Sequence, residues 1–256
     1  MKKKYIFDLN CLSKIRASER KKFINDFKVN NHLNAVHKQI KINKKKINYS
    51  KIHSISLFSG AGGLDLSSVL SGVKVLSSLD FDQDSIRTIK QNTIFKDGDH
   101  FCADIRDFDL KKYNHILKKN KTEKLILIGG PPCQPFSKAG YWVTHKNILG
   151  KKDPRNMISE FLNVIKVMQP DGFIIENVES ILHPKNLIVV KEIEEFIYKN
   201  NFNLIRHSTN AIDYGVPQKR KRVFFIASKK KIKFEPVCTH GKNLKPYERV
   251  LDWIYN

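Results

Sequence analysis

Cys133 is the residue whose surroundings best suit a nucleophile. It follows the apolar run Leu125–Ile128 and then Gly-Gly-Pro-Pro at 129–132, so it stands on a tight, stiff turn just past a predicted strand. In open α/β sheets, ligands and reacting groups collect at the carboxyl ends of the strands. The alternative is an ordinary buried cysteine in a turn. Two prolines fix this backbone while glycines allow another molecule to approach closely, a combination that favours a thiolate held at one position.

Glu176 stands in the same relation to another predicted strand. It directly follows the apolar run Phe173–Ile175, so we expect it to face the same crevice as Cys133. A thiolate can add to an electron-poor carbon while a carboxyl group donates a proton to the ring under attack. A helix-capping or salt-bridged acid is the alternative for Glu176 taken alone.

Gln218, Arg220 and Arg222 alternate with lysines just before the apolar run Val223–Ile226. In a strand these three side chains share one face. A charge run is usually a solvated surface. Three forked polar side chains entering an apolar strand fit contacts to bases or phosphates better.

The stretch Ser56–Asp65 joins a predicted strand to a predicted helix and is rich in glycine. Such a loop lets a ligand reach backbone N–H groups at a helix N-terminus. Its spacing is neither the Gly-x-Gly-x-x-Gly of dinucleotide sites nor a P-loop, which argues against a nicotinamide or flavin oxidoreductase. Asp80 ends the next strand and is placed to bind a ribose, Phe81 could stack on a purine, and Asp104 follows near a third strand. Loop and acids in this order suit a cofactor that carries adenosine.

The elements that position these residues alternate between strand and helix. Apolar runs predict strands at 52–58, 73–79, 124–129, 172–176, 202–209 and 222–228. Helical periodicity predicts helices near 63–71, 83–92, 156–168 and 187–200, with a further short helix around 246–254. This alternation favours an α/β fold with a mostly parallel sheet and helices on both faces.

The composition indicates a globular protein with a polyanionic partner. The chain has 256 residues, 41% of them hydrophobic, and 47 basic residues against 25 acidic ones give a net charge of +22. So large an excess points to nucleic acid. No apolar run is long enough to span a membrane and no signal peptide is evident, so we expect a cytoplasmic protein. The four cysteines are scattered, which argues against a metal site and a disulfide framework.

Residues 1–50 differ from the rest and form a predicted basic, helical extension ahead of a catalytic domain at 51–256. They hold 14 Lys and Arg and three acids, with an apolar helix face at Phe23, Ile24 and Phe27. A solvated surface helix and a direct contact to phosphates are equally compatible with this pattern.

The chain carries three motifs in order: Gly-Pro-Pro-Cys-Gln at 130–134, Glu-Asn-Val at 176–178 and Gln-x-Arg-x-Arg at 218–222. Taken together, they resemble the motifs of the cytosine-5 DNA methyltransferases. The resemblance covers about residues 52 to 254. It implies an S-adenosylmethionine-dependent, Rossmann-like fold with a mostly parallel seven-stranded sheet, and methyl transfer to C5 of a flipped cytosine in double-stranded DNA. It also implies a restriction-modification setting.

The resemblance assigns roles to individual residues. Cys133 is the nucleophile, Glu176 the acid at ring nitrogen N3, Arg222 a contact to the base carbonyl, and Arg220 a further catalytic-site residue. The cofactor-binding residues are expected to be Phe58, Gly60, Gly62, Leu64, Asp80, Phe81, Asp104, Ile105 and Pro131. At the ribose position the family usually has Glu rather than Asp80, and Trp is frequent in place of Phe81.

The family continues past Gln-x-Arg-x-Arg with a target-recognition domain and a final Gly-Asn motif, which are missing here. Only 34 residues follow Arg222, with Gly241 their sole glycine. We therefore expect the catalytic subunit of a split enzyme, completed by a second polypeptide. An inactive or regulatory homologue that binds cofactor or DNA and a tRNA cytosine-5 methyltransferase are the alternatives.

Overall fold

The computed structural model describes residues 50–108, 123–132 and 157–250. The chain divides into a unit of residues 43–248 and a second unit of residues 1–42 and 249–256. The predicted helix of the N-terminal extension lies outside the described residues.

A seven-stranded sheet organises this unit, in the order β3-β2-β1-β4-β5-β7-β6. β1 to β5 pair in parallel, and β7 is antiparallel to both β5 and β6. The strands are β1 Ile52–Leu57, β2 Lys74–Asp80, β3 Asp99–Cys102, β4 Lys124–Gly129, β5 Gly172–Val178, β6 Asn203–Asn210 and β7 Lys221–Ser228. The mostly parallel α/β fold expected from the sequence is confirmed.

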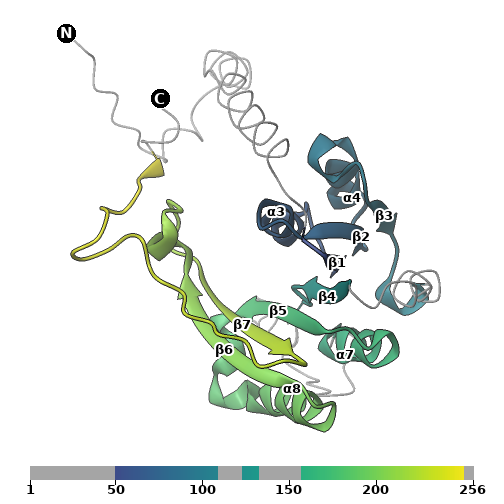
Figure 1. Ribbon diagram of the computed structural model, residues 1–256. Helices are drawn as coiled ribbons and strands as arrows, with labels where there is room; N and C mark the ends of the chain where they lie inside the picture. The colour runs from purple at the N-terminus through teal and green to yellow at the C-terminus, as the bar shows by residue number, and fades with distance from the viewer. Residues whose placement is uncertain (1–49, 109–122, 133–156, 251–256) are drawn as a thin grey trace, which may run out of the picture. The chain divides into compact units, whose positions relative to one another are not determined.

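Helices cover both faces of the sheet, with α3 and α4 on one side and α7 and α8 on the other (Figure 1). Alternation along β1 explains this arrangement, because Ser56 contacts Asp65 of α3 while the next residue, Leu57, packs in the core cluster with α7 and α8. The helices are α3 Gly63–Leu70, α4 Gln83–Gln91, α7 Met157–Met168 and α8 Leu187–Lys199.

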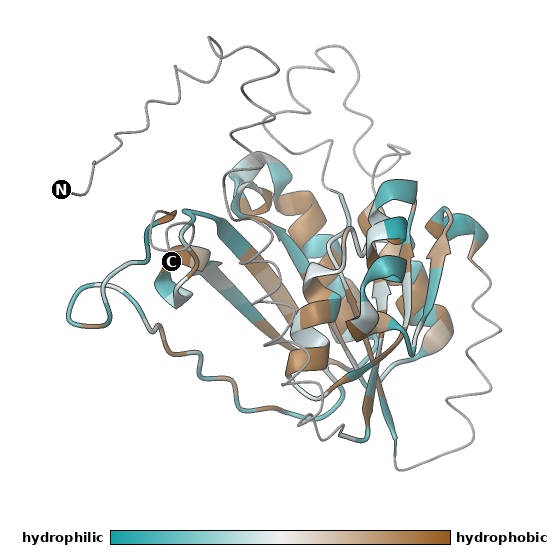
Figure 2. Ribbon diagram, turned by 90° about the horizontal axis from the view of Figure 1, so that it is seen from above, coloured by the Kyte–Doolittle hydropathy of each residue, from teal (hydrophilic) through white to brown (hydrophobic). Residues whose placement is uncertain are grey.

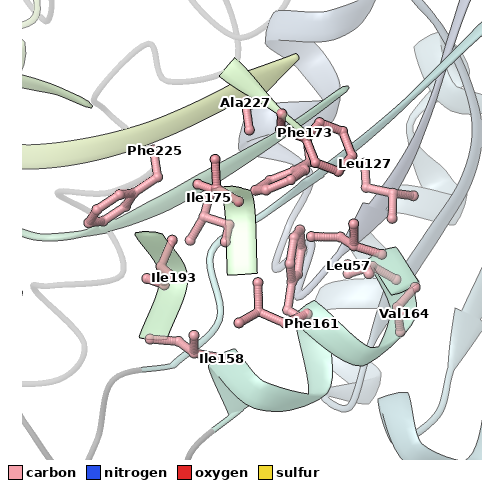
Figure 3. Packing of buried hydrophobic residues seen from close by; sticks show 14 of the residues in the cluster. Leu57, Leu127, Ile158, Phe161, Val164, Phe173, Ile175, Ile193, Phe225 and Ala227 are labelled. Carbon is pink, nitrogen blue, oxygen red and sulfur yellow. The ribbon is translucent and has the colours of Figure 1, made fainter. Parts of the chain in front are cut away.

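The core lies between the sheet and the pair α7 and α8. Phe161 of α7 is fully buried and contributes to one cluster with Phe173 and Ile175 of β5 and with Phe225 of β7 (Figure 3). Figure 2 shows hydrophobic residues gathered along the strands. Burial of these side chains supplies the main driving force for the fold.

All six strands and four helices expected from periodicity are present, with boundaries within a few residues. β3 has no apolar run, so the sequence predicts a third strand near Asp104 without giving its bounds. Residues 246–249 have no helical structure, and the remainder of the short helix expected around 246–254 lies largely outside the described residues. None of the helices within the described ranges is long and apolar enough to cross a membrane.

Candidate functional site

A cavity of about 570 Å³ opens at the carboxyl ends of β1, β2 and β4. It brings together residues from five separate stretches of the sequence, as strand ends in a parallel sheet do. Six of the nine residues expected to bind a cofactor line it. These six are Phe58, Gly60, Asp80, Phe81, Asp104 and Ile105.

Asp80 holds the glycine-rich loop in place. Its Oδ2 accepts a 2.7 Å hydrogen bond from the Gly60 N–H, and its Oδ1 accepts one of 2.9 Å from the Asp82 N–H. The loop bends sharply here, since Phe58 has a left-handed backbone with φ of 55°. Such a conformation costs a non-glycine residue about 1–3 kcal/mol and is typical of functional sites. The loop is therefore fixed at both the acid and the aromatic residue that face the cavity.

Two further residues that line the cavity are a fixed acid, Asp104, and an exposed aromatic ring, Phe81. Hydrogen bonds from the Arg106 side chain and backbone N–H lower the pKa of Asp104 to about 2. Asp104 is therefore a carboxylate at neutral pH. The Phe81 ring is 78% exposed although it is large and apolar. An exposed ring beside a cavity suits stacking on a flat ligand.

A second cavity, of about 430 Å³, contains the carboxyl group of Glu176. Arg222 Nε lies 2.6 Å from Glu176 Oε1, and Arg220 Nη2 lies 3.9 Å from the same oxygen. Both arginines reach Glu176 because β7 runs antiparallel to β5, which sets Arg222 opposite Val178. The Oε2 atom lies on the side of Gly130, where an added Cβ would be only 3.0 Å away.

The two cavities share three lining residues, Phe58, Gly60 and Gly130. Ligands in the two cavities would therefore lie next to each other, in contact with the same three residues. The arrangement suits transfer of a group from a ligand in the first cavity to a ligand held beside Glu176 in the second.

The other residues predicted for the site, among those that the structure describes, do not line the first cavity. Leu64 lines the second cavity rather than the first. Gly62, with φ of 89°, packs against Phe95, and Pro131 is buried; neither is among the residues that line the two cavities. Gln218 and Arg220 precede β7 rather than belonging to it. Cys133 lies outside the described residues.

Asn177 is a residue at the site that the sequence reasoning did not single out. It is buried, and its Nδ2 donates a 3.1 Å hydrogen bond to the carbonyl oxygen of Pro131. Its Oδ1 accepts one of 2.9 Å from the Val178 N–H. Asn177 thus ties the end of β5 to the turn that leads into Cys133. The available signal was its position at the end of the apolar run of β5, because a buried amide needs hydrogen-bond partners for both its oxygen and its nitrogen.

The described residues contain no group of three or more His, Cys, Asp and Glu side chains placed to hold a metal ion.

Comparison with known proteins gives a consistent picture. Residues 52–251 match the family described as C-5 cytosine-specific DNA methylase. The chain is 34% identical over 177 residues to the Type II methyltransferase M.FnuDI of Fusobacterium nucleatum, a match covering 69% of this chain and 46% of that protein. It is 32% identical over 222 residues to the Type II methyltransferase M.AquIA of Picosynechococcus sp., covering 78% of this chain and 86% of that protein.

Among solved structures, the fold resembles a prophage-encoded protein of E. coli assigned as a DNA modification methyltransferase. The TM-score is 0.56 with 29% identity, and the match covers 70% of this chain and 47% of that one. A methyltransferase of Entamoeba histolytica, EhMeth, shares the fold with a TM-score of 0.57 and 24% identity, over 75% of this chain and 57% of that one. The chain thus spans about half the length of M.FnuDI and of these solved chains.

Proposed function

Because the chain belongs to the C-5 cytosine-specific DNA methylase family, we propose that it methylates C5 of cytosine in DNA, with S-adenosylmethionine as the methyl donor. The observation that carries the proposal is the shared wall of the two cavities. One cavity suits a nucleoside-bearing donor and the other holds a carboxyl group and a guanidinium group that suit a base. Methyl transfer requires these two ligands to meet.

The residues of the first cavity fit the donor. Its volume of about 570 Å³ falls within the range usual for a small-molecule cofactor. Asp80 would hold the ribose, Phe81 would stack on the adenine, and Asp104 and Ile105 would meet the adenine edge. When bound, S-adenosylmethionine supplies a methyl group activated by its sulfonium charge.

The second cavity would receive the cytosine, flipped out of the duplex because C5 and C6 cannot be reached inside it. Arg222 holds Oε1 of Glu176, so Oε2 is the oxygen that would meet ring nitrogen N3. We assign Arg222 itself to the base carbonyl and Arg220 to the outer edge of the same cluster.

Cys133 would supply the nucleophile for this reaction. Its thiolate forms a bond to C6 while Glu176 supports the developing charge at N3, which makes C5 electron-rich enough to take the methyl group. Loss of the proton from C5 then breaks the bond between sulfur and C6 and releases the thiolate. Both residues would be needed, because addition of the thiolate to C6 places negative charge on the ring and Glu176 supports that charge at N3.

The second polypeptide expected from the sequence stays a proposal, as does the restriction-modification setting. The names of the Type II relatives support the setting. M.AquIA, 86% of which is covered by the match, supports an enzyme chain of comparable size. In this proposal, recognition of the target sequence comes from residues beyond those described here.

The test is transfer of labelled methyl from S-adenosylmethionine to mixed-sequence DNA, with tRNA in parallel. The chain is assayed alone and with the product of the adjacent gene, and Cys133→Ala is the control. Label that enters DNA and is lost in Cys133→Ala supports the proposal, and dependence on the second product supports the split enzyme. Label that enters only tRNA, or no label although the donor binds, would overturn the proposed reaction.

A further inference from the structure

Asp65 is a fully buried carboxyl group that the proposed transfer reaction does not use. It lies in the first turn of α3 and has 0% of its surface exposed. Ser56 Oγ donates a 2.8 Å hydrogen bond to its Oδ2, and Ser78 Oγ donates another to its Oδ1. The two serines are register partners on β1 and β2. One carboxyl group therefore fastens α3 to two neighbouring strands.

This contact lies next to the cofactor cavity along both strands. Two residues past the serine on each strand, Phe58 and Asp80 line the cavity. The glycine-rich loop starts after Phe58 and ends at α3, where Asp65 is the third residue. The position of Asp65 thus sets both the strand end and the helix end of the loop. Displacements of about 1 Å in such supports are enough to weaken binding or slow a reaction.

His100 extends the network to a third strand. It is the register partner of Ser78 on β3, and its Nδ1 lies 3.2 Å from Ser78 Oγ. Its Nε2 lies 2.8 Å from the carbonyl oxygen of Phe95, which can only accept, so Nε2 carries a proton. When Ser78 gives its single proton to Asp65, the bond to Nδ1 requires a second proton on His100.

The same hydrogen bonds also form when the second proton lies on Asp65 instead of His100. Asp65 can then be a carboxylic acid that donates to Ser78, while Ser78 donates to Nδ1 of a neutral His100. Both arrangements hold one proton and carry no net charge. Burial raises the pKa of Asp65, which favours keeping this proton. Its loss leaves a buried negative charge and sets lone pairs of Ser78 and His100 against each other.

We propose that Asp65 is a positioning residue for the cofactor loop, and that Asp65, Ser78 and His100 hold one shared proton whose loss weakens cofactor binding. The proposal rests on the proposed function for its cofactor. It adds a support for the loop, and a dependence on pH, that the reaction scheme does not contain.

The other charged groups of the described elements packed here are engaged or exposed elsewhere. On α4, Asp84 and Arg87 form an exposed ion pair of 3.0 Å, and Lys90 is exposed. On the strands, the remaining titratable groups are His53 with Glu123, the half-buried Lys74, Asp80 with its two backbone donors, and the exposed Asp99 and Cys102. Lys96 and Asp97, which follow Phe95, are exposed. The buried negative charge of Asp65 thus has His100 as its partner among the described side chains.

The test measures the affinity for S-adenosylmethionine by calorimetry from about pH 6 to pH 9, because a linked proton makes binding depend on pH. We expect the wild-type affinity to fall by about tenfold with rising pH, since one linked proton changes binding by at most tenfold per pH unit. Asp65→Asn is expected to give a flat profile, because its amide donates to one serine and accepts from the other without needing the proton. Asp65→Leu, which can do neither, is expected to bind weakly at every pH.

A flat wild-type profile, or an Asp65→Asn profile with the wild-type slope, would overturn the proposal. Absence of binding by the wild type at every pH would instead count against the proposed function. NMR without cofactor then decides the shared proton: Nδ1 of His100 and the carboxyl carbon of Asp65 are expected to titrate together with one midpoint. Separate midpoints would refute the shared proton. This measurement uses the wild type, so it decides the question even if Asp65→Asn does not fold.

Discussion

Gly129 offers a sharp test of how the site is anchored to the sheet. An alanine Cβ at this position would lie 2.3 Å from the carbonyl oxygen of Leu57 and 2.7 Å from Cε2 of Phe161, whereas real Cβ atoms essentially never come within 3.0 Å. Leu57 is the register partner of Gly129 in the β1–β4 ladder, so its oxygen moves only with the strand. Phe161 is fully buried and cannot turn away.

The cost of Gly129→Ala follows from these two contacts. Overpacking a core ordinarily costs about 1–3 kcal/mol, and here one of the obstructing atoms belongs to the backbone. We expect the free energy of unfolding to fall by about 3 kcal/mol or more, which is a loss of at least about 150-fold in the folding equilibrium.

Urea denaturation measures this change, with Gly63→Ala as the matched control. Gly63 is the first residue of α3, and an added Cβ there meets nothing within 4 Å. The control is expected to be neutral or to gain up to about 1 kcal/mol. A loss below about 1 kcal/mol for Gly129→Ala, or an equal loss for the control, would refute the reasoning.

Three further predictions concern single contacts. Arg222→Lys loses the Nε contact to Glu176 and should slow methyl transfer by about a hundredfold. Arg220 is half exposed and its Nη2 lies 3.9 Å from Glu176, so Arg220→Lys should slow the reaction by less than about tenfold. The reverse order in the labelled-methyl assay would contradict our assignment. Asn177→Asp places a carboxylate oxygen against the Pro131 carbonyl and should lower the free energy of unfolding by about 2–3 kcal/mol, more than Asn177→Ala, and equal urea midpoints would argue otherwise. Folding lowers the pKa of Asp104 from 3.8 to about 2, so its contribution to stability is present above the unfolded pKa and is lost as pH falls through the folded pKa. Arg106→Gln should therefore flatten the pH dependence of unfolding between these two pKa values. An unchanged acid profile would count against the Asp104–Arg106 pair.

Much of the fold was readable from the sequence because the buried strands carry continuous apolar runs. Leu125–Ile128 and Phe173–Ile175 mark β4 and β5 without any knowledge of their neighbours. β3 gave no such signal, since its four residues Asp99–Cys102 lie at the sheet edge and are only partly buried. Its position depends on pairing with β2, which periodicity cannot reveal.

The site was readable in part for a related reason. Glu176 and Arg222 stand at the ends of apolar runs in β5 and β7, and the pairing of these two strands places their side chains 2.6 Å apart. The hydrogen bonds of Asp65 to two strands could not be predicted, because an acid after a glycine-rich turn is typical of a helix start. Its partners, Ser56 and Ser78, are 9 and 13 residues away and become neighbours only when β1 and β2 pair.

The wall formed by Phe58, Gly60 and Gly130 has a thermodynamic consequence. Because the same three residues line both cavities, we expect occupancy of one to change the free energy of filling the other. Linkage makes this effect reciprocal: whatever factor the cofactor contributes to the affinity for a base, the base contributes to the affinity for the cofactor. The order in which the two ligands arrive then changes the kinetics of assembly without changing the stability of the ternary complex.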